Sequence, residues 1–100
     1  MKSKPVDYLP GAQLDIEESA TWYETKEIGV GSRFEAAVAL AEKKLQRAPL
    51  LGRPYRRHTR KWRVPHFPHN VIYREEPDRI LIVAIAHPKR EDDYWDERVP

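Results

Sequence analysis

The 100-residue chain contains no cysteine, which excludes disulfide bonds, cysteine-bound zinc and a cysteine nucleophile. Long apolar runs are also missing. The longest, residues 80–86, has seven residues, whereas a helix needs about 20 to span a bilayer. Residues 1–4 are mainly polar and lead into no apolar stretch, so nothing resembles a signal peptide. These absences favour a cytoplasmic protein that does not associate with membranes.

The composition that remains is typical of a soluble globular protein, with 40% hydrophobic and 34% charged residues. A hydrophobic core needs most of a chain this short. Residues 1–100 are therefore expected to form one domain.

Positive charge is concentrated in the middle of the sequence. Residues 53–74 contain seven lysines and arginines and no acidic residue, whereas the balance is seven against eight in residues 1–52 and four against eight in residues 75–100. Tyr55 and Trp62 are interleaved with the basic side chains, which suits an anionic partner such as nucleic acid or an acidic peptide. The alternative is an arginine-rich strand face that is only solvated.

The first half of the chain predicts a strand followed by two helices. Residues 6–9 form the strand, which a turn at Pro10 ends. A first helix follows from Ala12 to about Gly29, with acidic residues near its start, where the helix dipole favours carboxylates. These acidic residues are Asp15, Glu17 and Glu18.

A second helix is predicted to begin at Ser32, because Glu35 lies three residues later, as in a capping box. It ends before Pro49. Its apolar residues recur at helical spacing, so one face is expected to be buried in the core and the two helices to form a hairpin. This apolar stripe consists of Phe34, Ala37, Val38, Leu40, Ala41 and Leu45.

The second half predicts three strands. In residues 55–65, Trp62 and Val64 point to one face and Lys61 and Arg63 to the other. A proline-bounded bend at 65–68 separates this strand from a second at 71–73, and a turn at 75–78 leads to a third at 80–86. The fold class is therefore α+β: an N-terminal strand, a helical hairpin and a small antiparallel sheet of three further strands.

The last strand is apolar on both of its faces, although one helical hairpin covers only one face of a sheet. A second cover is therefore required. It is supplied either by a partner polypeptide or by Tyr94 and Trp95 folding back over the strand. The acidic residues 91–97 form either a helix or a flexible cap, and they could screen the basic segment.

Several short motifs are distributed over these elements: F-P-x-x-V-x-Y at 67–73, A-x-A-H-x-x-R at 84–90, Tyr94–Trp95, Trp22–Tyr23, and Pro49 with Gly52. Together with the order of the elements, these motifs resemble the RelE/ParE superfamily of bacterial toxins. The resemblance implies the toxin of a type II toxin–antitoxin module, held in a hetero-oligomeric complex by an antitoxin whose C-terminal segment wraps the toxin. No cofactor is implied.

Within this superfamily, RelE-like members cut mRNA in the ribosome, whereas ParE-like members poison DNA gyrase and are not enzymes. The intact motifs resemble the ParE-like, plasmid-stabilisation side more closely. If the chain is instead a ribosome-dependent mRNA endonuclease, the resemblance implies that Lys61, Arg63, Arg90 and Tyr94 are catalytic. His87 is a further candidate, because an imidazole suits proton transfer. Asn70 stands where RelE-like members have a further arginine. A third alternative is a non-toxic nucleic-acid-binding module that uses residues 53–74.

Three histidines and three tryptophans require separate interpretation. His87 is either a proton-transfer group or a hydrogen-bonded structural residue. His66 and His69 point to opposite faces of an extended chain and have no accompanying carboxylate, so no metal site is expected. Packing is the favoured interpretation for the three tryptophans, with base stacking as a second possibility for Trp62. They are Trp22, Trp62 and Trp95.

Overall fold

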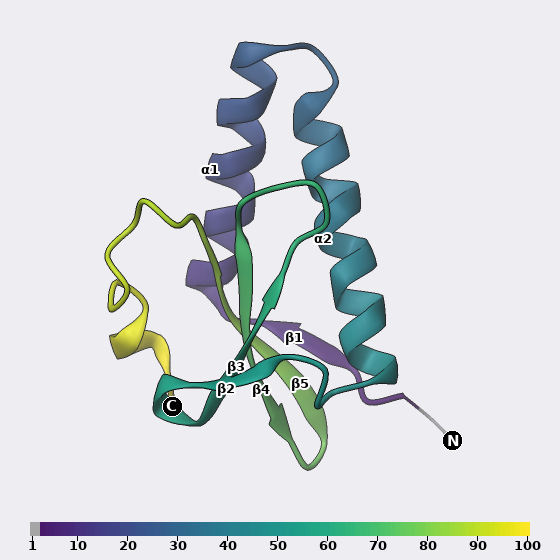
Figure 1. Cartoon of the computed structure of the whole chain (residues 1–100), viewed down its shortest axis with the longest axis vertical. Coiled ribbons are helices and arrows are strands. Elements are labelled where there is room, and N and C mark those ends of the chain that lie inside the picture. Colours follow the sequence, from purple (N-terminus) through teal and green to yellow (C-terminus); the bar gives the residue numbers. More distant parts are fainter. Residues whose placement is uncertain (1–2) are drawn as a thin grey trace.

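A five-stranded mixed sheet carries a helical hairpin on one face (Figure 1). The computed structural model describes residues 3–100. The strand order is β1-β5-β4-β3-β2, with β1 parallel to β5 and the other neighbours antiparallel. Along the chain the elements are β1 (Val6–Tyr8), α1 (Pro10–Lys26), α2 (Val30–Arg47), β2 (Arg53–Tyr55), β3 (Thr59–Arg63), β4 (Asn70–Glu76) and β5 (Arg79–Ala86).

The α+β class and the order of the elements are confirmed, but four strands follow the helices where the sequence predicted three. The predicted strand over residues 55–65 is divided, because Arg57 and His58 adopt left-handed backbone angles (φ 56° and 59°) that reverse the chain. The residues before this reversal form β2, an edge strand that tolerates Pro54. In addition, β1 joins β5 in parallel, so the sheet is not purely antiparallel.

The predicted capping box at the start of the second helix is wrong. Helix α2 begins two residues before Ser32, after Gly29 in a left-handed conformation (φ 92°). The carboxylate of Glu24 on α1 accepts hydrogen bonds from the backbone N–H groups of Gly29 (2.9 Å) and Gly31 (3.0 Å). The neighbouring helix thus satisfies the free N–H groups that a local side chain would otherwise cap.

The core lies between the helical hairpin and the sheet. All predicted residues of the α2 stripe are buried except Leu40, which is 61% exposed, so the stripe is narrower than expected. Within residues 3–100, neither helix is long and apolar enough to cross a bilayer. The α2 stripe packs with α1 against one face of the sheet, formed by Val71, Tyr73, Ile80, Ile82 and Ile85.

Tyr73 stabilises the loop between α2 and β2 by two hydrogen bonds. Its hydroxyl donates a hydrogen bond to the carbonyl of Pro49 (2.7 Å) and accepts one from the N–H of Gly52 (2.9 Å). A Cβ at Gly52 would overlap the Tyr73 ring, so only glycine allows this approach. The tyrosine of the F-P-x-x-V-x-Y motif and the Pro49/Gly52 pair therefore belong to one contact.

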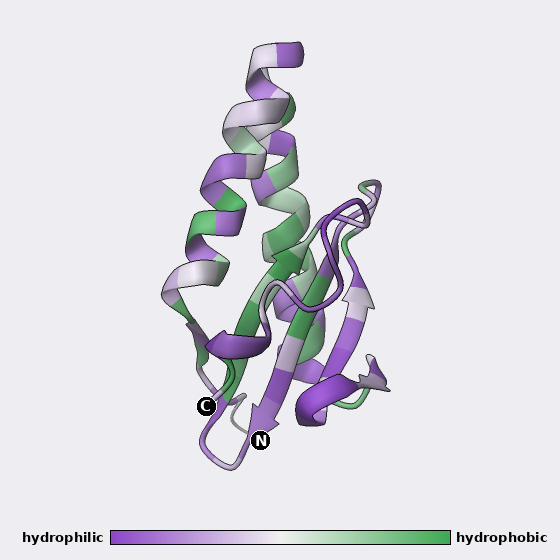
Figure 2. Ribbon diagram, turned by 90° about the vertical axis from the view of Figure 1, so that its left-hand side faces the viewer, coloured by the Kyte–Doolittle hydropathy of each residue, from purple (hydrophilic) through white to green (hydrophobic). Residues whose placement is uncertain are grey.

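The protein covers the second face of the sheet with its own C-terminal segment, residues 88–99. Trp95 is 1% exposed and packs on the far face of β4 and β5, on Ile72, Leu81, Val83 and Ala84. Figure 1 shows this segment (yellow) leaving β5 and curving back towards the sheet. In Figure 2 one central strand is green, for hydrophobic residues, along most of its length, and its neighbour turns purple towards its end. Within this segment, helical geometry is confined to a 3₁₀ turn at Asp96–Arg98.

Candidate functional site

A buried carboxylate on α1 anchors the C-terminal segment. Asp15 is 5% exposed and accepts hydrogen bonds from the Tyr94 hydroxyl (2.9 Å), Arg98 Nη1 (2.8 Å) and the N–H of Ile85 (3.1 Å). Gly11 leaves room for the Arg98 guanidinium, which a Cβ there would overlap. The sequence placed Asp15 near the start of a helix, where the helix dipole favours carboxylates. Helix α1 begins at Pro10 and has no acidic residue in its first turn, and Asp15 is a buried residue of this helix.

Most arginines in residues 53–74 stabilise the fold through ion pairs and hydrogen bonds. Arg56 pairs with Asp96 (2.7 Å), and Arg74 donates to the backbone carbonyl of Arg57 (2.6 Å). Arg60 donates to the carbonyl of Gly52 (2.7 Å). These contacts hold the turns at the edge of the sheet and tie the C-terminal segment to them.

Four of the five candidate catalytic residues line one small pocket. The fifth, Arg63, lies on β3 opposite Asn70 on β4. It lines a neighbouring hollow together with Lys61. The Lys61 ammonium lies 4.7 Å from the centre of the Tyr55 ring. The small pocket is lined by Lys61, His87, Arg90 and Tyr94, together with Asn70, Glu91 and Asp92 among others.

His69 and His87 meet at the ends of β4 and β5, edge to face, with ring centres 4.9 Å apart. The backbone N–H of Lys89 donates to His87 Nδ1 (3.0 Å), so a neutral His87 carries its hydrogen on Nε2. His69 is 2% exposed, and its Nδ1 has no hydrogen-bond partner in the part of the chain that the structure describes. The sequence grouped His69 with His66, whereas the pairing of Asn70 with Ala86 places His69 beside His87.

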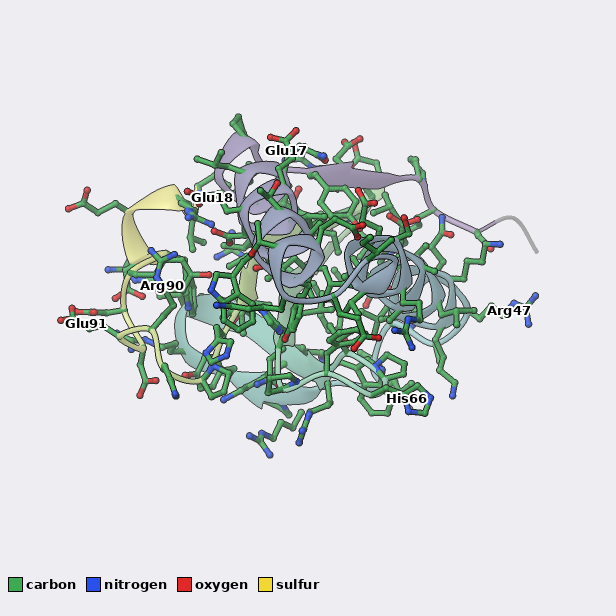
Figure 3. All side chains as sticks on the ribbon, turned by 90° about the horizontal axis from the view of Figure 1, so that it is seen from above. Glu17, Glu18, Arg47, His66, Arg90 and Glu91 are labelled. Carbon is green, nitrogen blue, oxygen red and sulfur yellow. The ribbon has the colours of Figure 1, made fainter. Side chains whose placement is uncertain are left out.

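A larger pocket, which we call the Trp22 pocket, opens between α1 and the C-terminal segment. Its volume is about 470 Å³. Figure 3, which looks down the helices, shows Glu18 on α1 and Arg90 on the C-terminal segment on one side of the molecule, and Arg47 on the other. The Trp22 pocket is lined by Glu18, Ser19, Trp22, Tyr23, His69, His87, Lys89 and Arg90.

A family model described as the ParE toxin of the type II toxin–antitoxin system parDE matches residues 6–92. The chain belongs to the ParE toxin family. Among curated proteins, none is significantly similar to this toxin. The match spans every helix and strand from β1 to β5, together with the start of the C-terminal segment.

Solved toxin–antitoxin structures share the fold of this toxin. A chain of the chromosomal ParDE system from P. aeruginosa is 17% identical, with a TM-score of 0.76 over 85% of this chain and 96% of that chain. A chain of the RelBE2 toxin–antitoxin complex from Mycobacterium tuberculosis is 21% identical, with a TM-score of 0.59 over 86% and 99%. At these identities the similarity concerns the fold.

In this toxin, Tyr94 is engaged inside the protein. Burial, followed by the neighbouring Asp15 carboxylate, raises the pKa of Tyr94 above the usual value of 10. The Tyr94 hydroxyl donates to Asp15, and the Arg90 guanidinium lies 3.9 Å from the centre of the Tyr94 ring. Tyr94 therefore holds the C-terminal segment and positions Arg90.

Sequence reasoning missed Asp15 and Trp22 as parts of this region. Trp95 is buried as expected, but Trp22 is 55% exposed. The burial of Asp15 was indicated in the sequence by its position next to Ile16, on the apolar side of α1. Within the described range 3–100, no group of three metal-binding side chains is arranged to hold an ion.

Acidification is expected to destabilise the toxin partly through His69. Its imidazole titrates near 6.5 when exposed, whereas burial, followed by His87, lowers the pKa of His69 to about 4, with Asp15 acting in the opposite direction. The unfolded state therefore binds more protons between these two values, and the free energy of unfolding falls as the pH drops through this window. Between about pH 7 and about pH 4.5, urea denaturation should show the wild type losing roughly 2 kcal/mol more than His69→Gln. Identical pH dependence in both proteins would contradict this role of His69.

Proposed function

We propose that this toxin acts by binding DNA gyrase, without cutting RNA, and that a cognate antitoxin neutralises it. Membership of the ParE family supports the toxin role. The observation that carries the choice of target is the hydrogen bond between the Tyr94 hydroxyl and Asp15 (2.9 Å), because it engages the hydroxyl that a nuclease site would use.

RNA cleavage by the 2′-hydroxyl group needs a proton acceptor, positive charge at the phosphorane and a proton donor for the leaving 5′-oxygen. The small pocket is poorly equipped for this chemistry. Asn70 adds no charge opposite Arg63, and the carboxylates of Glu91 and Asp92 line the same pocket as Lys61. These features favour a protein-binding mode of action.

A ribosome-dependent mRNA endonuclease is the second candidate. It is supported by the pocket that Lys61, His87 and Arg90 line together. Lys61 comes from β3, and the other two come from the segment after β5. In its neutral form, His87 offers an Nε2–H donor beside Arg90.

An antitoxin would find a suitable surface between α2 and β3. Exposed Leu40 lies there in a groove with Trp62 and Pro65. Four cations line the same groove, which favours an apolar segment bearing acidic residues. They are Lys43, Lys44, Arg47 and Arg63.

Two parallel assays separate the candidate targets. The purified protein should block supercoiling by gyrase and trap gyrase–DNA cleavage complexes, while mRNA on translating ribosomes stays intact. The opposite result, mRNA cut within codons and cleavage lost in Arg90→Ala but retained in Lys43→Ala, would replace gyrase by the ribosome. Lys43 is a matched control because it is an exposed cation remote from Arg90.

The antitoxin half of the proposal is tested in cells. Expression of the chain alone should arrest growth, and co-expression of the adjacent reading frame should restore growth and yield a complex that copurifies. Normal growth of cells that accumulate the folded chain alone would contradict toxicity.

A further inference from the structure

The Trp22 pocket contains a large aromatic surface that the core does not use. Trp22 is 55% exposed, yet its ring contacts two other side chains of α1. Tyr23 meets it edge-on at 5.2 Å, and the Lys26 ammonium lies 5.1 Å from its centre. A planar ligand could stack on this ring without first ordering it, which lowers the entropic cost of binding.

The opposite side of the Trp22 pocket carries positive charge. Lys89 and Arg90 are both exposed, and neither takes part in an ion pair anywhere in residues 3–100. The Arg90 guanidinium is oriented by the Tyr94 ring (3.9 Å), a contact that leaves its charge in place. These two cations and the Trp22 ring lie in one pocket.

Two histidines add polar groups to the same pocket. His87 has an Nε2–H donor in its neutral form, because its Nδ1 accepts the Lys89 N–H. His69 is almost fully buried in the pocket wall, and its Nδ1 lacks a partner among the described residues. A buried polar atom without a hydrogen bond costs about 1–3 kcal/mol, so it marks a site where a bound group or water is favoured.

We propose that the Trp22 pocket binds a ribonucleotide unit, with its base stacked on Trp22 and its phosphate at Lys89 and Arg90. Stacking on an aromatic ring tolerates any base, because every base has a planar face. The Glu18 carboxylate and the Ser19 hydroxyl offer hydrogen-bond partners for the sugar. The volume of about 470 Å³ lies in the range of small-molecule pockets.

This site is separate from the small pocket under the C-terminal segment, although the two share His87 and Arg90. A free nucleotide and the end of an RNA strand present the same base and phosphate. The proposal holds whichever cellular target the toxin has, because it depends only on the residues between α1 and the C-terminal segment.

The test is a titration of the full chain with adenosine monophosphate and, separately, with a 5′-phosphorylated penta-adenylate. Calorimetry measures the affinity, and the NMR signal of the Trp22 indole N–H reports binding at Trp22. At least one of the two probes should bind and shift that signal. Trp22→Leu should weaken binding by about 5- to 100-fold, because stacking of a base is worth roughly 1–3 kcal/mol. Binding of the monophosphate alone identifies a free nucleotide, and preference for the penta-adenylate identifies an RNA strand.

Charge variants complete the test. Lys89→Gln should weaken binding of the penta-adenylate and reduce the slope of log affinity against log salt by about 0.7. Lys43→Gln, which removes an equally exposed charge from the groove between α2 and β3, should change neither. The proposal is overturned if neither probe shifts the Trp22 signal, if a folded Trp22→Leu variant binds as tightly as the wild type, or if both lysine variants lose equal affinity.

Discussion

Asp15→Asn is expected to lower the free energy of unfolding by about 3 kcal/mol. The substitution leaves the Arg98 guanidinium without its charged partner at 2.8 Å and deprives the Tyr94 hydroxyl of a carboxylate acceptor. The charge of Arg98, whose side chain is only 22% exposed, then lacks its counter-charge, which costs more than the original pair contributes. Urea denaturation measures the loss.

Glu17→Gln is the matched control for Asp15→Asn, because Glu17 is an exposed carboxylate on the same helix. It should change the free energy of unfolding by less than about 0.5 kcal/mol. The combined variant with Arg98→Met should lose much less than the sum of the single variants, since the two side chains act as one unit. Additive losses, or equal stability of Asp15→Asn and Glu17→Gln, would show that this ion pair does not anchor the C-terminal segment.

Trp95→Ala is expected to cost about 3–5 kcal/mol, the range for truncating a large buried aromatic side chain. Trp95 is 1% exposed, and its removal uncovers Ile72, Leu81 and Val83 on the far face of the sheet. The C-terminal segment should then detach more readily, so a protease should cleave within residues 88–99 before the rest of the domain unfolds. Urea denaturation and timed proteolysis provide the two measurements.

Trp22→Ala is the control for Trp95→Ala, because Trp22 is more than half exposed. It should cost clearly less, about 1 kcal/mol. If Trp95→Ala were as stable as Trp22→Ala and equally resistant to protease in residues 88–99, the C-terminal segment would not be the cover of the second face.

The helices and strands of this toxin could be predicted wherever the spacing of neighbouring apolar residues determines which face is buried. The helical spacing of Phe34, Val38 and Ala41 and the two-residue alternation around Trp62 each reflect which face is buried. Division of the predicted strand over residues 55–65 could not be foreseen in the same way. It depends on left-handed backbone angles at two successive residues, Arg57 and His58, and such angles are uncommon for any residue other than glycine.

The candidate site was only partly predictable. Lys61, His87, Arg90 and Tyr94 line one pocket, whereas Arg63 lies in a neighbouring hollow. A match of residues to a family by their sequence positions says nothing about their hydrogen bonds. The hydrogen bond from Tyr94 to Asp15 was therefore not foreseen.

By itself, the sequence determined the α+β class, the family and the need for a second cover over β5, because these follow from local spacing and ordered motifs. Tertiary structure alone decided which partner each polar group takes. Asp15 meets Tyr94 across 79 positions and Arg98 across 83. Such pairings arise only once the sheet places the end of β5 beneath α1, since no local pattern records a contact between residues so far apart in the chain.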